Sequence, residues 1–184
     1  MTEVLTLAFN RDPVWGWAFP DEERRASQHR VFWRLFVDGA MDHDWIRMTA
    51  DGGAVALWLP PGCPEMPAEA EARVPAVLSE LLGDAQAEVV LEVFERFAAA
   101  RPSDPHYYLS LLGTRPDHRG KGLGMGLVAA NLAAIDATGM PAYLESTNPA
   151  NVDRYRRAGF EPVGEFALPL DGPPVTTMWR DPQD

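Results

Sequence analysis

The sequence predicts a mixed α/β domain, and two patterns carry this prediction. A β-like segment, Tyr107–Thr114, leads through a glycine-rich turn to an amphipathic helix, Leu123–Ala137, and then to a short strand, Pro141–Glu145. Such a strand–helix–strand unit pairs its strands in parallel, whereas hairpins elsewhere imply antiparallel pairing. With 184 residues, 46% of them hydrophobic, the chain suits one domain with its own core. We therefore expect a single domain over 1–184, with a central mixed sheet and helices on both faces.

The first forty residues are predicted to be mainly helical. Thr2–Phe9 carries apolar side chains at helical spacing. Residues 13–20 contain two prolines and a glycine among aromatic residues, and this composition is typical of a turn. Asp21 is expected to be the N-cap of a helix that runs to about residues 36–41. The apolar face of that helix is expected to comprise Val31, Phe32, Leu35 and Phe36.

A hairpin and two helices are expected next. Segments Asp44–Thr49 and Ala54–Leu59 are expected to be strands. The sequence Asp-Gly-Gly at 51–53 joins them and favours a hairpin turn. Residues 64–83 and 84–99 are rich in Ala, Glu and Leu, which favour helix, and Gly83 separates them.

The C-terminal part is predicted to contain one more helix and a strand pair. Asn151–Ala158 is helical in pattern, and Gly159 follows where a helix commonly ends. Phe160–Leu168 and Pro174–Arg180 are expected to pair as the last two strands. The chain shows no internal repeat and no low-complexity segment.

Composition narrows the class of protein. No apolar run approaches the roughly 20 residues of a membrane helix, and no basic stretch followed by an apolar segment opens the chain, so a cytoplasmic location is expected. The lone Cys63 leaves no internal disulfide and no cysteine-based metal cluster, and no metal is expected. The net charge of −11 disfavours nucleic acid and would attract cationic partners such as small amines, although solubility alone also explains it. The sequence leaves the oligomeric state open, a dimer included.

The glycine-rich turn at 119–124, Arg-Gly-Lys-Gly-Leu-Gly, is the first functional signal. Glycines let the backbone approach a ligand closely, and the start of a helix offers unpaired N–H groups to an anion. The spacing fits neither the Gly-x-Gly-x-x-Gly pattern of dinucleotide folds nor a P-loop, since Lys121 is followed by Gly122. The remaining interpretations are a phosphate cradle and a flexible turn with two solvated cations.

A second segment decides between them. Residues 144–161 read Leu-Glu, then an Asn-bearing loop, then a helix with Tyr155, then Gly159-Phe160, about thirty residues after the glycine turn. Together with the Arg-x-x-Gly-x-Gly pattern, this order resembles the GCN5-related N-acetyltransferases, the GNAT superfamily, which bind acetyl-coenzyme A. Looser matches at 8–13, at 55–60 and at 178–180 are similar to the puromycin N-acetyltransferase-like subgroup. Such proteins usually place a strand before the first helix, but here the helix comes almost at once, so either that strand is missing or the sheet begins differently.

The resemblance implies the GNAT fold and a set of acetyl-CoA contacts. Main-chain groups of one strand would line the pantetheine arm and polarise the thioester, and the glycine turn would hold the diphosphate. Thr114 stands where the family generally has Val, which main-chain contacts should tolerate. The implied cofactor-binding residues are Leu112, Gly113, Thr114, Arg119, Gly120, Lys121, Gly122, Leu123, Gly124, Met125, Asn148 and Asn151.

Tyr155 is the family's usual proton donor to the coenzyme A thiolate, and it is the one catalytic residue that the resemblance implies. A phenol with a pKa near 10 is protonated at neutral pH and can serve as a general acid; the alternative is a core tyrosine on an amphipathic helix. Asn148 could equally be a helix cap. No general base is assigned. Glu145 ends a strand near the reaction centre, His106 and His118 are expected in surface loops, and a water-mediated route needs no side chain.

The acceptor side is expected to be aromatic. Trp15 and Trp17 lie in the Pro/Gly-rich turn, where a pocket role is plausible, whereas Trp33 and Phe36 lie on a helical face that suggests core packing. The candidate substrate-binding residues are Trp15, Trp17, Phe19, Trp33, Trp58 and Glu145.

The leading hypothesis is an acetyl-CoA-dependent N-acetyltransferase that acts on the primary amine of a small molecule by direct attack. Residues of about 1–104 would form the acceptor side, and about 105–184 the acetyl-CoA side. Two alternatives stay open: a non-catalytic acyl-CoA-binding regulatory module and a protein N-acetyltransferase.

Overall fold

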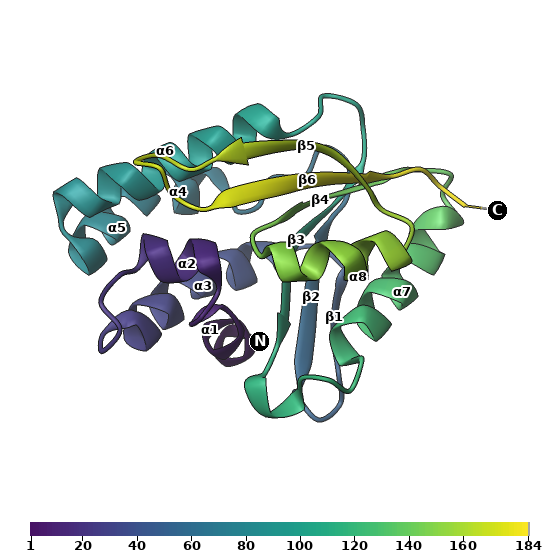
Figure 1. Ribbon diagram of the computed structural model, residues 1–184, viewed down its shortest axis with the longest axis horizontal. Helices are drawn as coiled ribbons and strands as arrows, with labels where there is room; N and C mark the ends of the chain where they lie inside the picture. The colour runs from purple at the N-terminus through teal and green to yellow at the C-terminus, as the bar shows by residue number, and fades with distance from the viewer. Residues whose placement is uncertain (184) are drawn as a thin grey trace.

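The computed structural model describes residues 1–183 and shows a six-stranded mixed sheet in the order β1-β2-β3-β4-β6-β5 (Figure 1). The strands are β1 (Ile46–Met48), β2 (Ala54–Leu59), β3 (Tyr107–Thr114), β4 (Ala142–Ser146), β5 (Glu161–Ala167) and β6 (Pro174–Arg180). The helices are α1 (Thr2–Phe9), α2 (Pro13–Ala18), α3 (Arg25–Ala40), α4 (Ala68–Glu71), α5 (Val74–Leu82), α6 (Asp84–Ala100), α7 (Leu123–Asp136) and α8 (Val152–Arg157). Two short 3₁₀ turns, η1 (Pro116–His118) and η2 (Pro149–Asn151), precede α7 and α8.

The expected crossover is confirmed. Strand β3 leads through α7 to β4, and these two strands pair in parallel, while the other four pairings are antiparallel. The sheet therefore combines a parallel centre with antiparallel flanks, as the sequence pattern indicated.

The central strands diverge at one end. Strands β3 and β4 are paired only through Tyr107↔Ala142 and Tyr108↔Tyr143. Beyond these pairs β3 remains joined to β2 as far as Thr114, and β4 remains joined to β6 as far as Ser146. Beyond Tyr108 and Tyr143, the edges of β3 and β4 that face one another are therefore not paired with each other. Their main-chain N–H and C=O groups are available to another partner.

A β-bulge at Ser110 changes which face the β3 side chains occupy. The β2–β3 register shifts between Leu57 and Trp58, because Leu57 pairs with Leu111 and Trp58 with Leu109. Before the bulge, Leu109 packs in the core against α7; after it, Leu111 packs with the N-terminal helices. One extra residue therefore redirects the alternation of a strand between the two faces.

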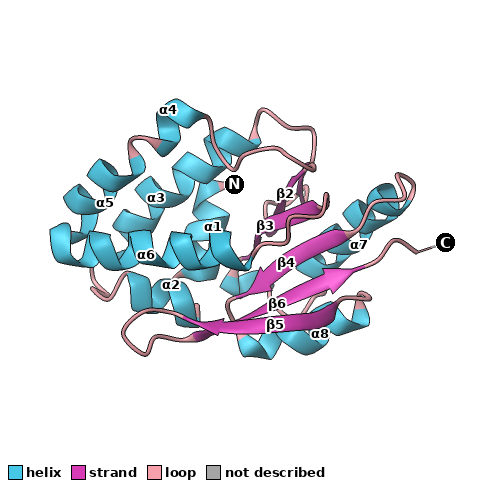
Figure 2. Ribbon diagram, turned by 90° about the horizontal axis from the view of Figure 1, so that it is seen from above, coloured by secondary structure: helices cyan, strands magenta, loops and turns pink. Residues whose placement is uncertain are grey.

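The helices divide between the faces of the sheet. Helices α1, α3, α5 and α6 share one core with inward residues of β2 and β3, whereas α7 and α8 share a second core on the opposite face. Figure 2 shows α1–α6 gathered on one side of the strands, with α7 and α8 on the other side. Within 1–183, no helix is both long and apolar enough to cross a membrane.

The expected turn at 13–20 is wrong, because residues 13–18 form helix α2. Oδ1 of Asp12 accepts hydrogen bonds from the N–H groups of Val14 and Trp15, at 3.0 and 3.2 Å, and Pro13 occupies the first helical position. An Asp cap followed by Pro is a helix-start signal, since proline lacks the N–H that a helix start leaves unpaired. The two prolines and the glycine of residues 13–20 favoured a turn, and that expectation did not take the Asp12-Pro13 helix start into account.

Two helix boundaries also differ from expectation. Oδ1 of Asp21 caps the amides of Glu23 and Arg24, but α3 begins only at Arg25, and Val31 on that helix is 48% exposed rather than on the apolar face. The helix expected over 64–83 is two helices, α4 and α5, with Pro75 in the first turn of the second. Within the described residues, α1 is the first element and the short hairpin strand β1 lies at the edge of the sheet beside β2.

Candidate active site

The glycine turn has the backbone geometry of an anion cradle. Gly120 and Gly122 have φ of 80° and 74°, the left-handed region that favours glycine, and nothing lies within 4 Å of a Cβ built on either residue. Gly122 is the N-cap of α7, so the unpaired N–H groups of that helix's first turn begin directly after it. The turn therefore presents main-chain donors and the positive end of a 14-residue helix to the space beside it.

That space is a groove of about 550 Å³ that runs from the glycine turn toward the divergence of β3 and β4. Most of the expected cofactor-binding residues line it. They are Leu112, Thr114, Arg119, Gly120, Gly122, Leu123, Gly124, Met125, Asn148 and Asn151, and Tyr155 lines it too.

Two of the expected contacts do not line the groove. Gly113 faces α1, and a Cβ there would lie 3.1 Å from Leu5 Cδ2 and 3.2 Å from Ala8 Cβ, so this glycine permits close packing of α1 on β3. The side chain of Lys121 is exposed outside the groove lining.

The groove is cationic although the chain is acidic. Arg11, Arg119 and Arg154 line it together with His118, and Asp12 is the one acidic residue in that lining. Nη2 of Arg119 donates to the Ala8 carbonyl at 2.9 Å, which fastens the glycine turn to the end of α1. Arg11 and Arg154 were missed in the sequence analysis, although Arg154 lies directly before Tyr155 and could have been noticed there.

A second, smaller cavity of about 80 Å³ adjoins the groove. Since one water needs roughly 10–15 Å³ by this measure, the cavity has room for a small organic group. Both hollows share five residues: Phe9, Asp12, Leu112, Asn151 and Tyr155. These five mark the opening through which a molecule in the cavity would meet one in the groove.

Aromatic side chains form one wall of the cavity. They come from α1, α2, α3 and α6, and they are Phe9, Trp15, Trp33, Phe36, Phe94 and Phe97. Trp15 and Trp33 meet edge to face with ring centroids 4.9 Å apart. Of the expected acceptor residues, Trp15, Trp33 and Glu145 are brought together here.

The other expected aromatic residues lie elsewhere. Phe19 is fully buried beneath the cavity wall, and Trp58 is fully buried in the core that β2 shares with α7. Trp17 packs near Gly172, with Cζ2 2.9 Å from a Cβ built there. None of the three is in the cavity lining.

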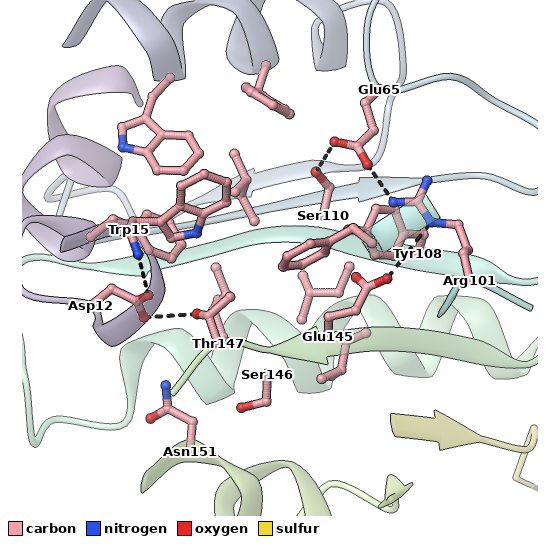
Figure 3. A pocket seen from close by; sticks show the side chains of 18 of the residues that line it. Asp12, Trp15, Glu65, Arg101, Tyr108, Ser110, Glu145, Ser146, Thr147 and Asn151 are labelled. Atoms are coloured by element: carbon pink, nitrogen blue, oxygen red, sulfur yellow. Dashed lines mark hydrogen bonds and ion pairs between the residues drawn. The ribbon is translucent and has the colours of Figure 1, made fainter. Parts of the chain in front are cut away.

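The far end of the cavity is polar (Figure 3). Arg101, at the end of α6, bonds Glu65 with Nη2–Oε1 at 2.6 Å and lies over the Tyr108 ring at 3.8 Å. Its Nε faces Oε1 of Glu145 across 4.0 Å, and neither atom has a hydrogen-bond partner within the described residues. The Glu145 side chain is 1% exposed, and burial raises its pKa to about 7 although Arg101 opposes the shift. Glu65 and Arg101 were missed because a loop and a helix end bring them here.

Asp12 occupies the opening between cavity and groove. Its Oδ1 caps α2, and its Oδ2 accepts a 2.9 Å hydrogen bond from Thr147 Oγ1. Burial raises the pKa of this carboxyl, while the bonds from Thr147, Trp15 and Val14 oppose the rise. A carboxylate offers about four lone-pair sites, so these three hydrogen bonds leave one for a further donor.

Tyr155 also lies at the opening, 8% exposed, with its ring packed near Phe160 at 6.2 Å between centroids. Burial and the nearby Asp12 carboxylate raise the pKa of its phenol above the ordinary value, so it is protonated at neutral pH. Asn148 Oδ1 accepts from the N–H of Ala150 and so caps η2, as the helix-cap interpretation of this residue predicted. Asn151 Oδ1 accepts from Arg154 Nη1 at 2.7 Å. His106 is buried against Tyr143 and Trp179 rather than in a surface loop.

Comparison with known proteins agrees with this geometry. Residues 84–162 match the domain family described as "Acetyltransferase (GNAT) domain", and this span contains β3, the glycine turn and Tyr155. A solved structure from Corynebacterium glutamicum, described as histone acetyltransferase HPA2 and related acetyltransferase, is 26% identical with a TM-score of 0.67, covering 100% of this chain and 90% of its own. Arylalkylamine N-acetyltransferase 2 from Aedes aegypti shares the fold at 15% identity with a TM-score of 0.66, covering 99% and 93% of the two chains.

The domain match places an acetyltransferase domain of the GNAT type over residues 84–162, and the fold and the groove agree with it. The protein is thus an enzyme of the acyltransferase class, and GNAT acetyltransferases use acetyl-CoA. The observed sheet and its flanking helices also confirm the GNAT fold that the resemblance implied.

Proposed function

We propose that the protein transfers the acetyl group of acetyl-CoA to the primary amine of a small molecule by direct attack. The observation that supports this most is the pair of connected hollows, a cationic groove with a glycine cradle and a smaller aromatic cavity, which share Asp12 and Tyr155. The first hollow suits a long anionic cofactor. The second suits a compact apolar acceptor rather than a polypeptide segment.

Cofactor binding would use both backbone and charge. The diphosphate would lie on the amides that follow Gly122, with Arg119, Arg154 and Arg11 beside it. The pantetheine arm would run between β3 and β4, where β3 from Leu109 onward has no β4 partner. Main-chain N–H groups near Leu112 would then polarise the thioester carbonyl.

The chemistry needs a proton acceptor and a proton donor at the opening. As the amine nitrogen forms its bond to the thioester carbon, it loses a proton, and the C–S bond then breaks to release a thiolate. Asp12 would accept the amine proton, directly or through water, because its raised pKa makes it a better base. Tyr155 would donate a proton to the thiolate, a role for which a protonated phenol is suited.

The division into an acceptor side over about 1–104 and a cofactor side over about 105–184 would hold in outline only. Arg11 and Asp12, from the first part, reach the groove, while Glu145 and Thr147, from the second, line the cavity. Each hollow would therefore be built from both parts of the chain.

The test combines binding and turnover. Acetyl-CoA and desulfo-CoA, in excess, should each raise the melting temperature, because a ligand of the native state stabilises it. Release of free thiol should then be measured with a panel of small amines and with peptides bearing a free N-terminus. Stabilisation without thiol release from any acceptor would favour the binding module, and release with peptides alone would favour protein acetylation.

A further inference from the structure

The polar end of the aromatic cavity holds two complementary atoms that form a long ion pair but have no hydrogen-bond partner among the described residues. Nε of Arg101 carries an N–H, Oε1 of Glu145 accepts, and they face one another across 4.0 Å. Both atoms are buried, and neither bonds to any other described residue. Buried polar atoms nearly always have a hydrogen-bond partner, so this pair indicates a place for a missing one.

The charges around the pair restrict what can fill it. Arg101 already neutralises Glu65 through a 2.6 Å contact, and it faces Glu145 on the other side. An added ammonium group would meet the guanidinium, and an added carboxylate would meet two acidic side chains. A neutral hydroxyl satisfies both atoms, since its oxygen can accept from Arg101 Nε–H while its proton goes to Glu145 Oε1.

The distance permits this arrangement. An oxygen lying beside the line that joins the two atoms can be about 2.8–2.9 Å from each, which is ordinary hydrogen-bond geometry. Ser110 Oγ lies near the same end, 3.5 Å from Glu65 Oε2, and Tyr108 forms the floor beneath the guanidinium. The site is thus built from β3, β4, the loop that carries Glu65 and the residue that follows α6.

The position of this pair within the cavity indicates which other chemical groups the ligand needs. Asp12 is at one end, and Glu65, Arg101 and Glu145 are toward the other (Figure 3). Tyr155 lines both hollows, as Asp12 does, and so belongs to the end that opens into the groove. Aromatic side chains line the cavity, and Phe97 connects the two ends: its ring centroid is 6.5 Å from that of Trp15, and its carbonyl accepts from the Arg101 N–H. A ligand that spans the cavity has an amine at one end, an aromatic or apolar body, and a polar group at the other.

We propose that the acceptor is an arylalkyl primary amine whose ring carries a hydroxyl group, and that Arg101 and Glu145 select for this hydroxyl. This inference rests on the proposed function, because it names the substrate class of the same site. Glu145 then acts in recognition at the distal end, away from the amine, and Arg101 is a specificity-determining residue rather than only a structural counter-charge.

The test compares matched amines: 2-phenylethylamine, its 4-hydroxy derivative and its 4-aminomethyl derivative. The wild-type protein should use the hydroxylated amine with kcat/KM at least about tenfold above the unsubstituted one, because the latter leaves both buried atoms unpaired. The aminomethyl derivative should be poorer than either, since it brings a second cation to Arg101.

Arg101→Lys provides the second arm. Lysine keeps a positive charge near Glu65 and Glu145 but lacks the Nε–H, so the preference for the hydroxylated amine should fall toward one while 2-phenylethylamine is still used. The matched control is Arg96→Lys on the same helix, whose guanidinium bonds Glu92 and the Ala167 carbonyl outside the cavity. In that control the preference should stay at its wild-type value.

The preference is a ratio measured within one preparation, so partial misfolding of a variant does not alter it. A wild-type ratio near one, or a ratio that Arg101→Lys leaves unchanged, overturns the inference while turnover of the amines leaves the proposed function standing. Absence of thiol release with all small amines overturns the proposed function itself.

Discussion

Thr147 donates a 2.9 Å hydrogen bond to Oδ2 of Asp12, although the two residues are 135 positions apart in the chain. The bond ties the start of α2 to the loop that follows β4, at the opening between the groove and the cavity. Because the other carboxylate oxygen of Asp12 caps α2, one side chain orients both the acceptor wall and the loop that leads to Tyr155.

Replacing Asp12 with Asn tests its role as proton acceptor. Asn caps a helix as well as Asp does, so α2 should persist, whereas an amide cannot take up the amine proton. We expect kcat/KM to fall roughly 10²–10⁴-fold and acetyl-CoA affinity to change little, as measured by thiol release and by calorimetric titration. Asp21→Asn is the matched control, since Asp21 also caps two amides but is exposed; equal losses in both variants would assign Asp12 a structural role.

Tyr155→Phe removes the proposed proton donor and keeps the ring that packs near Phe160. The expected result is a fall in kcat of about 10²–10⁴-fold, with the stabilisation by desulfo-CoA preserved. The loss should shrink for thioesters whose leaving thiol has a lower pKa, because such a thiolate needs less help from an acid. A uniform loss across those thioesters would remove Tyr155 from the proton transfer.

Gly39→Ala tests how the polar end of the cavity is held. A Cβ at Gly39 would lie 2.7 Å from Cα of Met66 and closer still to the Glu65 carbonyl, so the main chain that carries Glu65 would have to shift. We expect the free energy of unfolding to fall by about 1–3 kcal/mol and KM for the amine to rise, without a change in acetyl-CoA affinity. Gly126→Ala is the control, because open space surrounds that position, and a small gain of roughly 0.5–1 kcal/mol is expected there. Equal amine KM values for the two variants would contradict this account.

Glu145 should make stability depend on pH. Its pKa is about 7 in the folded protein, owing to burial, against 4.5 for an ordinary glutamate. Between these values the folded state binds more protons than the unfolded state, so the free energy of unfolding decreases as pH rises through this window and levels off above about 7. Glu145→Gln should remove this decrease, so that the variant gains on the wild type between about pH 5 and pH 8 in urea denaturation.

His29 acts in the opposite direction, which makes the comparison with the variant necessary. Burial lowers its pKa to about 4 from 6.5, so its contribution to stability is lost as pH falls through that range. The residue is present in both proteins and cancels in their difference. Parallel pH profiles of wild type and Glu145→Gln would contradict the assignment to Glu145.

Most residues that line the groove could be predicted from the sequence because their signals are local. Gly122 and the apolar pattern of α7 lie side by side in the chain, and the crossover that joins β3 to β4 follows from their spacing. The acceptor side is different. Arg101 and Glu65 lie 36 positions apart and meet only through tertiary packing, so no sequence period reveals them. Trp58 is a residue that the sequence suggested for the pocket and that the structure places elsewhere. Its aromatic side chain packs in the core that β2 shares with α7.

The bulge at Ser110 has a consequence for redesign. In the proposed function, strand β3 would contact the cofactor with its main-chain edge and the acceptor with its side chains. The extra residue determines which side chains of β3 face each side of the sheet. If Ser110 took an ordinary place in the ladder, strict alternation would turn Leu111 and Gly113 toward α7, and α1 would lose the flat surface that Gly113 provides. A design that transfers the acceptor cavity of a relative onto this chain must therefore keep the bulge, so that the same β3 side chains face each side of the sheet.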